Sequence, residues 1–399
     1  MKHFDFDTLA VHAGRDDFRE LGVHAPPLDL STTYPIPDLA EGTADIDAML
    51  RGERPSANNV YARLANPTVD RFEKAFAELE CADDAVSFGS GMAAVSAALL
   101  AATLCGKRHV IAVRPLYGGT DHLLASGLLG LDVTFTAAGT VSDHVRADTA
   151  LVVIETPANP TIALVDIADV VRQAGEVPVL VDSTFATPIL QQPLLHGAAM
   201  SLHSATKFIG GHGDVMAGVI ACTDEWARHL RLVRILTGGV LHPMAAYLLH
   251  RGLQTLPIRV RAAQASAMVL AQELLQHPSV SRVFFPGLAG GDPHQLLGRQ
   301  MRGPGTMIAF EMADGFDAAA SVMRNVTLMT PAVSLGSADT LIQHPAGLTH
   351  RVVDQAGLDE GGVTAGMLRV SVGLEDVTAL WKDLEAAIEI SARVELVSR

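Results

Sequence analysis

Between residues 64 and 255 the chain repeats one pattern, in which a short, almost unbroken apolar run is followed by a longer helix-like stretch. An unbroken apolar run is typical of a strand that is buried on both faces. Strands that alternate with helices predict a mostly parallel sheet, so the sequence predicts an α/β fold. The apolar runs lie at residues 85–88, 109–113, 151–154, 178–181 and 217–221.

The regions on either side of this pattern differ from it. The first 63 residues are rich in Pro, Asp, Asn and Arg, with weak periodicity, so we expect them to pack on something else. From residue 256 a long amphipathic helix candidate (257–276) leads into strand-like and helical pieces, including strand-like residues 306–311 and 368–372. The expected organisation is an arm over residues 1–63, a large domain over 64–255 and a smaller α+β domain over 256–399.

Composition narrows the class of ligand. The 399 residues carry 29 Lys and Arg against 44 Asp and Glu, a net charge of −15, which argues against a nucleic-acid or acidic-membrane partner and favours a small molecule. The sequence has no stretch of about 20 uncharged apolar residues, so it predicts no membrane-spanning helix. The three cysteines, Cys81, Cys105 and Cys222, are widely spaced, so we expect no disulfide framework, no metal site and a cytoplasmic location.

Polar residues follow several of the predicted strands, at the sheet edge where open parallel sheets bind ligands. A glycine turn containing Gly91 opens an alanine-rich helix and suits a phosphate, while Tyr117 offers a planar ring for stacking. Asn159 can form a hydrogen bond with a ring oxygen, and Asp182 ends a buried run, where a carboxylate needs a cation. Taken singly, a glycine turn is more often only a turn and the tyrosine more often a packing residue, while Asp182 is equally explained as a helix cap or a salt bridge.

Lys207 changes this balance. It lies in the sequence Ser204-Ala205-Thr206-Lys207, directly after a strand-like segment and before several glycines. A lysine that forms a Schiff base needs a partly desolvated amine on a rigid mount, and neighbouring hydroxyls can bind a phosphate. A lone lysine is usually a solvated charge. Together with Asp182, Tyr117 and the glycine turn, however, Lys207 meets the requirements of pyridoxal 5′-phosphate.

The segment 204–207, with Gly210 to Asp214 after it, resembles the signature of the pyridoxal-phosphate enzymes of Cys/Met metabolism. This family includes cystathionine γ-synthase, cystathionine γ-lyase, cystathionine β-lyase, methionine γ-lyase and the O-acylhomoserine sulfhydrylases. The resemblance extends from residue 8 to residue 376 and implies the aspartate-aminotransferase-like (type I) fold and a homotetramer of two tight dimers. Tyr61 and Arg63 resemble the pair that reaches into the neighbouring subunit's phosphate site, which would explain an arm without its own core.

The resemblance also implies roles for individual residues. Lys207 corresponds to the cofactor-bonded lysine, Asp182 to the partner of the pyridine nitrogen and Tyr117 to the stacking tyrosine, and these three form the expected catalytic set. Arg369, aided by Ser334, corresponds to the arginine that holds the substrate carboxylate. With Asn159 added, the expected cofactor-binding residues are Tyr61, Arg63, Gly91, Met92, Tyr117, Asn159, Asp182, Ser204, Thr206 and Lys207.

Only a few positions distinguish members of this family. Val333 stands where common cystathionine γ-lyases carry a glutamate, and His122 stands where they carry an arginine, so an uncharged substrate such as L-methionine is favoured. Gly119 stands where many methionine γ-lyases have a cysteine, as in cystathionine enzymes and sulfhydrylases, and Asp121-His122 corresponds to none of the subfamilies named above. We expect a γ-elimination that yields methanethiol, ammonia and 2-oxobutanoate. Cystathionine γ-lyase, cystathionine γ-synthase and O-acylhomoserine sulfhydrylase activities, the last by γ-replacement, stay open.

Overall fold

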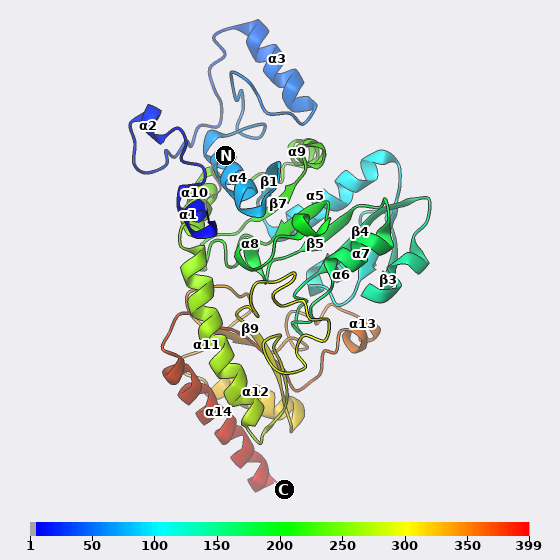
Figure 1. The fold of residues 1–399 in the computed structure, drawn as a ribbon, viewed down its shortest axis with the longest axis vertical. Coiled ribbons are helices and arrows are strands. Elements are labelled where there is room, and N and C mark those ends of the chain that lie inside the picture. Colours follow the sequence, from blue (N-terminus) through cyan, green and yellow to red (C-terminus); the bar gives the residue numbers. More distant parts are fainter. Residues whose placement is uncertain (1–4, 399) are drawn as a thin grey trace.

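The computed structural model describes residues 5–398, and its larger part is built on a sheet of seven strands (Figure 1). The strand order is β1-β7-β6-β5-β4-β2-β3, and only β7 runs antiparallel to its neighbours. The strands are β1 (Asp84–Phe88), β2 (His109–Val113), β3 (Asp132–Thr136), β4 (Thr149–Glu155), β5 (Val179–Asp182), β6 (Met200–His203) and β7 (Gly218–Cys222).

Both faces of this sheet are covered, which explains the unbroken apolar runs. Along β2, Val110 and Ala112 join the apolar cluster under α5 and α9, whereas Ile111 and Val113 join the cluster under α7. Successive strand residues point to opposite faces, so a strand covered on both sides must be apolar throughout. The helices of this part are α4 (Pro67–Glu80), α5 (Gly91–Ala102), α6 (Gly118–Ala125), α7 (Ile167–Ala174), α8 (Thr187–Leu190), α9 (Asp224–Thr237) and α10 (Pro243–Leu253).

A second sheet lies beyond helix α11 (Leu256–Gln276), which runs from the large sheet past the small one (Figure 1). Its strand order is β10-β11-β12-β9-β8, and only the β10–β11 pair is parallel. The strands are β8 (Val280–Phe284), β9 (Met307–Met312), β10 (Thr330–Pro331), β11 (Leu341–Gln343) and β12 (Met367–Ser371). The helices beside them are α12 (Gly315–Asn325), α13 (Gln355–Glu360) and α14 (Val377–Ser398).

The predicted fold class is confirmed, with three differences in detail. The buried strand β6 lies outside the predicted apolar runs because it carries Ser201 and His203, which form a hydrogen bond with each other. The strand β3 does not read as an apolar run because it is an edge strand, paired only with β2 and only partly buried. The antiparallel direction of β7 follows from its position between β6 and β1, which no apolar pattern reveals. The expected boundaries at residues 63 and 255 stay a prediction.

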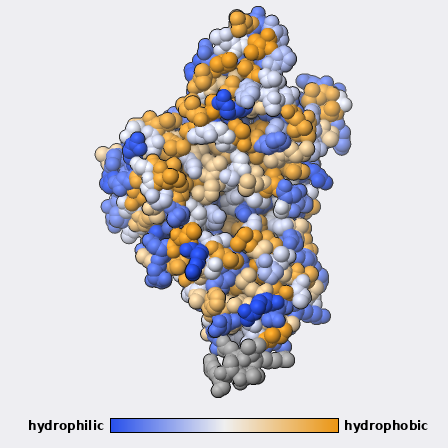
Figure 2. All heavy atoms as spheres, turned by 180° about the vertical axis from the view of Figure 1, so that it is seen from behind, coloured by the Kyte–Doolittle hydropathy of each residue, from blue (hydrophilic) through white to orange (hydrophobic). Residues whose placement is uncertain are grey.

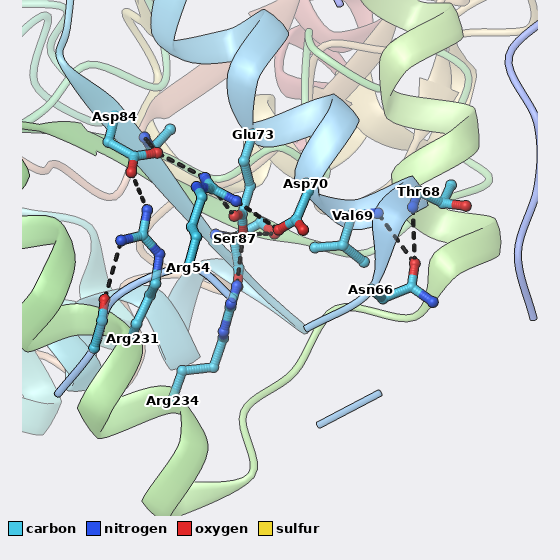
Figure 3. Close-up of polar contacts among 12 residues, drawn as sticks. Arg54, Asn66, Thr68, Val69, Asp70, Glu73, Asp84, Ser87, Arg231 and Arg234 are labelled. Carbon is cyan, nitrogen blue, oxygen red and sulfur yellow. Dashed lines mark hydrogen bonds and ion pairs between the residues drawn. The ribbon is translucent and has the colours of Figure 1, made fainter. Parts of the chain in front are cut away.

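The N-terminal arm is held to the large sheet by largely buried ion pairs (Figure 3). Arg54 lies among three carboxylates, donating to Asp70 at 2.5 Å, to Glu73 at 3.2 Å and to Asp84 at 2.7 Å. Two arginines of α9 complete this six-charge cluster, because Arg231 pairs with Asp84 and Arg234 with Glu73. The arm's own helices are α1 (Phe6–His12), α2 (Phe18–Leu21) and α3 (Leu39–Leu50), the last of which projects at the top of Figure 1.

Helix α4 begins beside this cluster, and the residues at its start favour a helix N-terminus. The Asn66 side chain accepts from the amides of Thr68 at 3.0 Å and Val69 at 3.2 Å, and Pro67 occupies the first helical position (Figure 3). Over residues 5–398, none of the helices is long and apolar enough to cross a membrane.

Candidate active site

Lys207 lies in the turn after β6, where a loop from the small sheet meets it. Its Nζ donates to the hydroxyl of Ser334 at 2.6 Å. Burial lowers the pKa of the Lys207 amine to about 8, and the nearby charge of Arg369 contributes in the same direction. The amine is therefore much more often neutral near physiological pH than an exposed lysine. This is the property that a nucleophilic or proton-transferring lysine requires.

Ser334 itself has an unusual backbone. Its φ of +84° places a non-glycine residue in the left-handed region, a conformation that other contacts must maintain. Two such contacts are present. The Ser334 hydroxyl accepts from Lys207, and its carbonyl accepts from Arg369 Nη2 at 2.9 Å. The residue thereby connects the lysine to the arginine.

Arg369 is almost fully buried on β12, with 2% exposure. Its Nη1 donates to Asn159 Oδ1 at 2.8 Å, and the Gln343 amide, turned so that its oxygen faces the guanidinium, accepts from Nη2 at 2.7 Å. Burial lowers the pKa of Arg369 to about 10, which still leaves it charged at neutral pH. The hydrogen-bond partners that the described residues give it are uncharged oxygens, so none of these bonds neutralises the guanidinium, which is the natural bidentate partner of a carboxylate.

Glu155 links this group to Tyr117. One carboxylate oxygen accepts from the amide of Asn159 at 2.8 Å and the other from the amide of Tyr117 at 2.6 Å. Burial, with Asp182 next to it, raises the pKa of Glu155 well above its ordinary value. Hydrogen bonds run without interruption from Lys207 through Ser334, Arg369, Asn159 and Glu155 to Tyr117.

Asp182 ends β5, directly beside Glu155 in the register of β4 and β5. The hydrogen bonds that the described residues give its carboxylate come from Thr184, at 3.0 Å from the amide and 2.5 Å from the hydroxyl. Burial raises the pKa of Asp182 despite them. A buried carboxylate with hydroxyl and amide donors is a good site for a cation, and the protonated pyridine nitrogen of pyridoxal phosphate fits that requirement.

The turn between β1 and α5 forms a cradle suited to a phosphate. Ser90 caps α5 by accepting from the Ala93 amide at 3.0 Å, and the first helical amides are those of Gly91 and Met92. A Cβ on Gly91 would lie 2.9 Å from the hydroxyl oxygen of Ser204, so only glycine lets this turn approach that hydroxyl. Free amides at a helix N-terminus beside a serine hydroxyl fit a phosphate group.

Other predicted residues lie elsewhere or are already engaged. The Thr206 hydroxyl donates to the carbonyl of Ala217 at 3.1 Å and accepts from its amide at 2.9 Å, so its phosphate role stays a prediction. Arg63 donates to the carbonyl of Ile235 on α9 at 2.8 Å, with the Tyr61 ring beside it. The cofactor role predicted for this pair stays a prediction.

Gly119 now has a structural explanation. A Cβ at this position would lie 2.6 Å from the Tyr117 ring and 3.3 Å from the sulfur of Met92. The tyrosine ring therefore fills the space that a side chain at 119 would need. Cysteine at this position requires a different orientation of the ring.

The sequence did not reveal several residues that complete the site. Glu155 occupies the same strand-end position on β4 as Asp182 does on β5, which is the one signal that pointed to it. His350 is buried beside Arg369, and burial lowers the pKa of its imidazole to about 4. Asp121 accepts two hydrogen bonds from Arg114, at 2.7 and 3.1 Å. Contacts across more than 200 residues, such as Arg369 with Asn159, leave no local pattern.

Comparison with known proteins gives a consistent picture. Residues 7–389 match the family described as Cys/Met metabolism PLP-dependent enzyme. An L-methionine gamma-lyase of Brevibacterium sandarakinum is 56% identical over 387 residues, covering 96% of this chain and 98% of the relative. An L-methionine gamma-lyase of Streptomyces avermitilis is 55% identical, covering 96% and 88%.

Solved structures of similar proteins have the same architecture. A cystathionine gamma synthase from Xanthomonas oryzae pv. oryzae, in complex with aminoacrylate and cysteine, has a TM-score of 0.90 at 32% identity and covers 98% of this chain and 99% of its own. A cystathionine gamma lyase from Micromonospora echinospora has a TM-score of 0.85 at 35% identity, covering 97% and 99%.

Proposed function

The chain belongs to the Cys/Met metabolism PLP-dependent enzymes, and we propose that it is a γ-lyase that converts L-methionine to methanethiol, ammonia and 2-oxobutanoate. The observation that carries the choice of substrate is the identity of 55–56%, over nearly the whole chain, to relatives named L-methionine gamma-lyase. The reaction class is supported by the partly neutral Lys207 amine and the buried Asp182 carboxylate, and by Tyr117, whose amide is hydrogen-bonded to Glu155 beside Asp182.

Bound pyridoxal phosphate supplies an electron-accepting ring that makes the Cα proton of an amino acid removable. Gly91, Met92, Ser204 and Thr206 are proposed to hold its phosphate. Asp182 is proposed to face its ring nitrogen, with Asn159 near the ring oxygen and Tyr117 on its face. Lys207 is the residue that bonds to it.

Lys207 is proposed to move protons as well. With a pKa of about 8 its amine is roughly one-tenth neutral at pH 7, enough to accept a proton from Cα of the substrate. The Ser334 hydroxyl at 2.6 Å gives the amine a defined position from which to approach. Tyr117 is proposed to donate the proton that leaves with the γ-thiolate.

Arg369 is proposed to bind the substrate carboxylate, helped by Ser334. Asn159 accepts from Nη1 of the guanidinium, and Ser334 and Gln343 accept from Nη2, so its orientation is set before substrate arrives. Val333 precedes Ser334 and is 52% exposed, so it can contact the far end of a substrate. An apolar residue there suits the thioether of methionine better than the charged end of cystathionine.

We also propose a homotetramer of two tight dimers with shared active sites. Over residues 5–63 the arm has no large core of its own, and it exposes Leu39 (78%) and Leu50 (52%). Apolar atoms gather on the lobe at the top of Figure 2, the region where Figure 1 places α3. In this proposal Tyr61 and Arg63 reach the neighbouring subunit's phosphate. The three free cysteines are in keeping with the proposed cytoplasmic location.

The proposal is tested by incubating the purified, cofactor-loaded protein separately with L-methionine, L-cystathionine and O-acetyl-L-homoserine, the last with and without a thiol. We expect 2-oxobutanoate and methanethiol from methionine, and none from the Lys207→Ala variant. Turnover of cystathionine alone, or of the ester only with added thiol, would instead identify one of the three alternative activities. Oxoacid release by Lys207→Ala with bound cofactor would refute the role of the lysine.

A further inference from the structure

Tyr117 lies in a turn that is fixed on two sides. On one side its amide donates to Glu155 at 2.6 Å. On the other side its carbonyl accepts from the amide of Asp121 at 3.0 Å, and the Asp121 carboxylate is bound by Arg114. The position of Tyr117 therefore depends on a pair of residues that takes no part in binding the cofactor.

The Arg114–Asp121 pair is deeply buried and has good geometry. Arg114 directly follows β2, and Asp121 lies in the first turn of α6. Two parallel hydrogen bonds join them, at 2.7 and 3.1 Å, and their side chains are only 7% and 4% exposed. The guanidinium also stacks on the ring of Phe135 at 3.8 Å. A bidentate buried pair of this kind is a rigid connection.

The outer side of the same guanidinium faces a segment from the small-sheet part of the chain. Arg114 Nη1 donates to Glu360 at 3.2 Å, and Nη2 lies 3.7 Å from Asp354. Gly357 of α13 packs flat against it, since a Cβ there would lie 3.0 Å from the guanidinium carbon. Unlike Asp121, the two outer carboxylates are 58% and 65% exposed, so each outer pair is weak and can open.

The segment before α13 also covers the tyrosine turn. A Cβ on Gly118 would lie 2.3 Å from the carbonyl oxygen of Thr349, so Thr349 packs directly on the residue after Tyr117. His350 follows, buried beside Arg369. The segment 349–360 thus packs on the turn that carries Tyr117 and lies beside Arg369. Its C-terminal end, at Glu360, is bound by Arg114.

We propose that Arg114 is a positioning residue that couples the docking of residues 349–360 to the placement of Tyr117. The inner pair keeps the turn rigid, and the outer pairs hold α13 reversibly against it. This assigns a role to Asp121, whose presence no family pattern explained. The inference deepens the proposed function, because Tyr117 is its proposed proton donor, but two of its three measurements need no turnover.

The test compares three variants of the cofactor-loaded protein. Arg114→Gln removes the inner pair with Asp121 and the outer pairs with Asp354 and Glu360. The double variant Asp354→Asn/Glu360→Gln removes only the outer pairs, and the asparagine at position 354 can still cap α13. The control is Arg146→Gln, since Arg146 also binds two carboxylates, Asp132 and Asp148, but away from Tyr117. The measurements are the rate of tryptic cleavage at the exposed Arg351, the visible circular dichroism of the bound cofactor, and kcat and KM.

For Arg114→Gln we expect faster cleavage at Arg351, a weaker cofactor signal and a kcat lower by about ten- to a hundredfold. The double variant is expected to speed cleavage severalfold and to lower kcat about three- to tenfold, while Arg146→Gln matches the wild type. Faster cleavage in the double variant with unchanged kcat and dichroism would overturn the coupling. Wild-type behaviour of Arg114→Gln in all three measurements would overturn the proposal entirely.

A further variant covers the case in which Arg114→Gln does not fold. Arg114→Lys keeps the charge for Asp121, but a single ammonium cannot bind the inner and outer carboxylates with the geometry of a guanidinium. We expect it to fold and to show the cleavage and dichroism changes of the double variant. Wild-type values for Arg114→Lys would contradict a bridging role. Because cleavage and dichroism do not depend on the substrate, they test the coupling even if methionine is not turned over.

Discussion

Replacing Arg54 by methionine tests what fixes the N-terminal arm to the large sheet. The substitution keeps most of the side-chain length but removes the hydrogen bonds to Asp70, Glu73 and Asp84. Asp84 keeps Arg231, and Glu73 keeps Arg234 together with the amide and hydroxyl of Ser87 (Figure 3). Asp70 loses the arginine that neutralises it.

The expected loss of stability follows from that one carboxylate. Removing one partner of a buried ion pair costs about 3–5 kcal/mol, because the other charge stays buried. The Asp70 side chain keeps 20% exposure, so we expect the lower end, about 3 kcal/mol. For a folding unit of roughly 150–250 residues, 1 kcal/mol lowers Tm by about 2–4 °C, which gives a fall of roughly 6–12 °C.

The assay is thermal unfolding of the cofactor-loaded protein at pH 7 and pH 5. Burial raises the pKa of Asp70 even with Arg54 present, so in the variant the folded-state pKa lies above the unfolded value. The folded variant then binds a proton that the unfolded chain does not. Its destabilisation should therefore shrink as pH falls from 7 towards 5.

Two further variants make the reasoning refutable. Arg51 lies three residues before Arg54 and forms an exposed ion pair with Glu53. Arg51→Met removes this pair and should leave Tm almost unchanged. The double variant Arg54→Met/Asp70→Asn removes the stranded charge and should recover about 1–2 kcal/mol. Strict additivity of the two changes, or a loss that does not depend on pH, would show that Asp70 is not the source of the instability.

Three predictions concern the active site. Gly119→Cys should turn the Tyr117 ring, because a Cβ at position 119 would lie only 2.6 Å from that ring. We expect an altered visible dichroism of the cofactor and a kcat changed at least about threefold, whereas an unchanged spectrum would contradict the close approach of the ring to position 119. Val333→Glu should raise KM for methionine about tenfold with little effect on kcat, because it places a charge beside an apolar thioether. An equal rise in KM for O-acetyl-L-homoserine, which has no thioether, would argue against a contact between residue 333 and the thioether. In the cofactor-free protein the rate of cofactor attachment should rise with pH to a midpoint near 8, because only the neutral amine of Lys207 reacts; a midpoint near 10.5 would show that the site does not desolvate it.

The fold was largely predictable because burial of the large sheet on both faces requires apolar runs in the sequence of its strands. Most strands of the large sheet that helices cover on both sides read as apolar runs. The partly exposed edge strand β3 does not, and the buried strand β6 is interrupted by Ser201 and His203. The strand-end positions of Tyr117 and Asp182 were predictable for a related reason. The ends of parallel strands gather at one edge of a sheet, so polar residues there point to a common site.

The sequence by itself determined which chemical groups are available: Lys207 among hydroxyls, a glycine turn before α5 and a carboxylate after β5. Only the tertiary structure decided how they are tuned and held. The pKa of Lys207 depends on burial beside Arg369, and the place of Tyr117 depends on Glu155 and on Arg114 with its partners near residue 360. Hydrogen bonds and burial between segments 100 to 250 residues apart are set by packing, and packing leaves no local pattern in the chain.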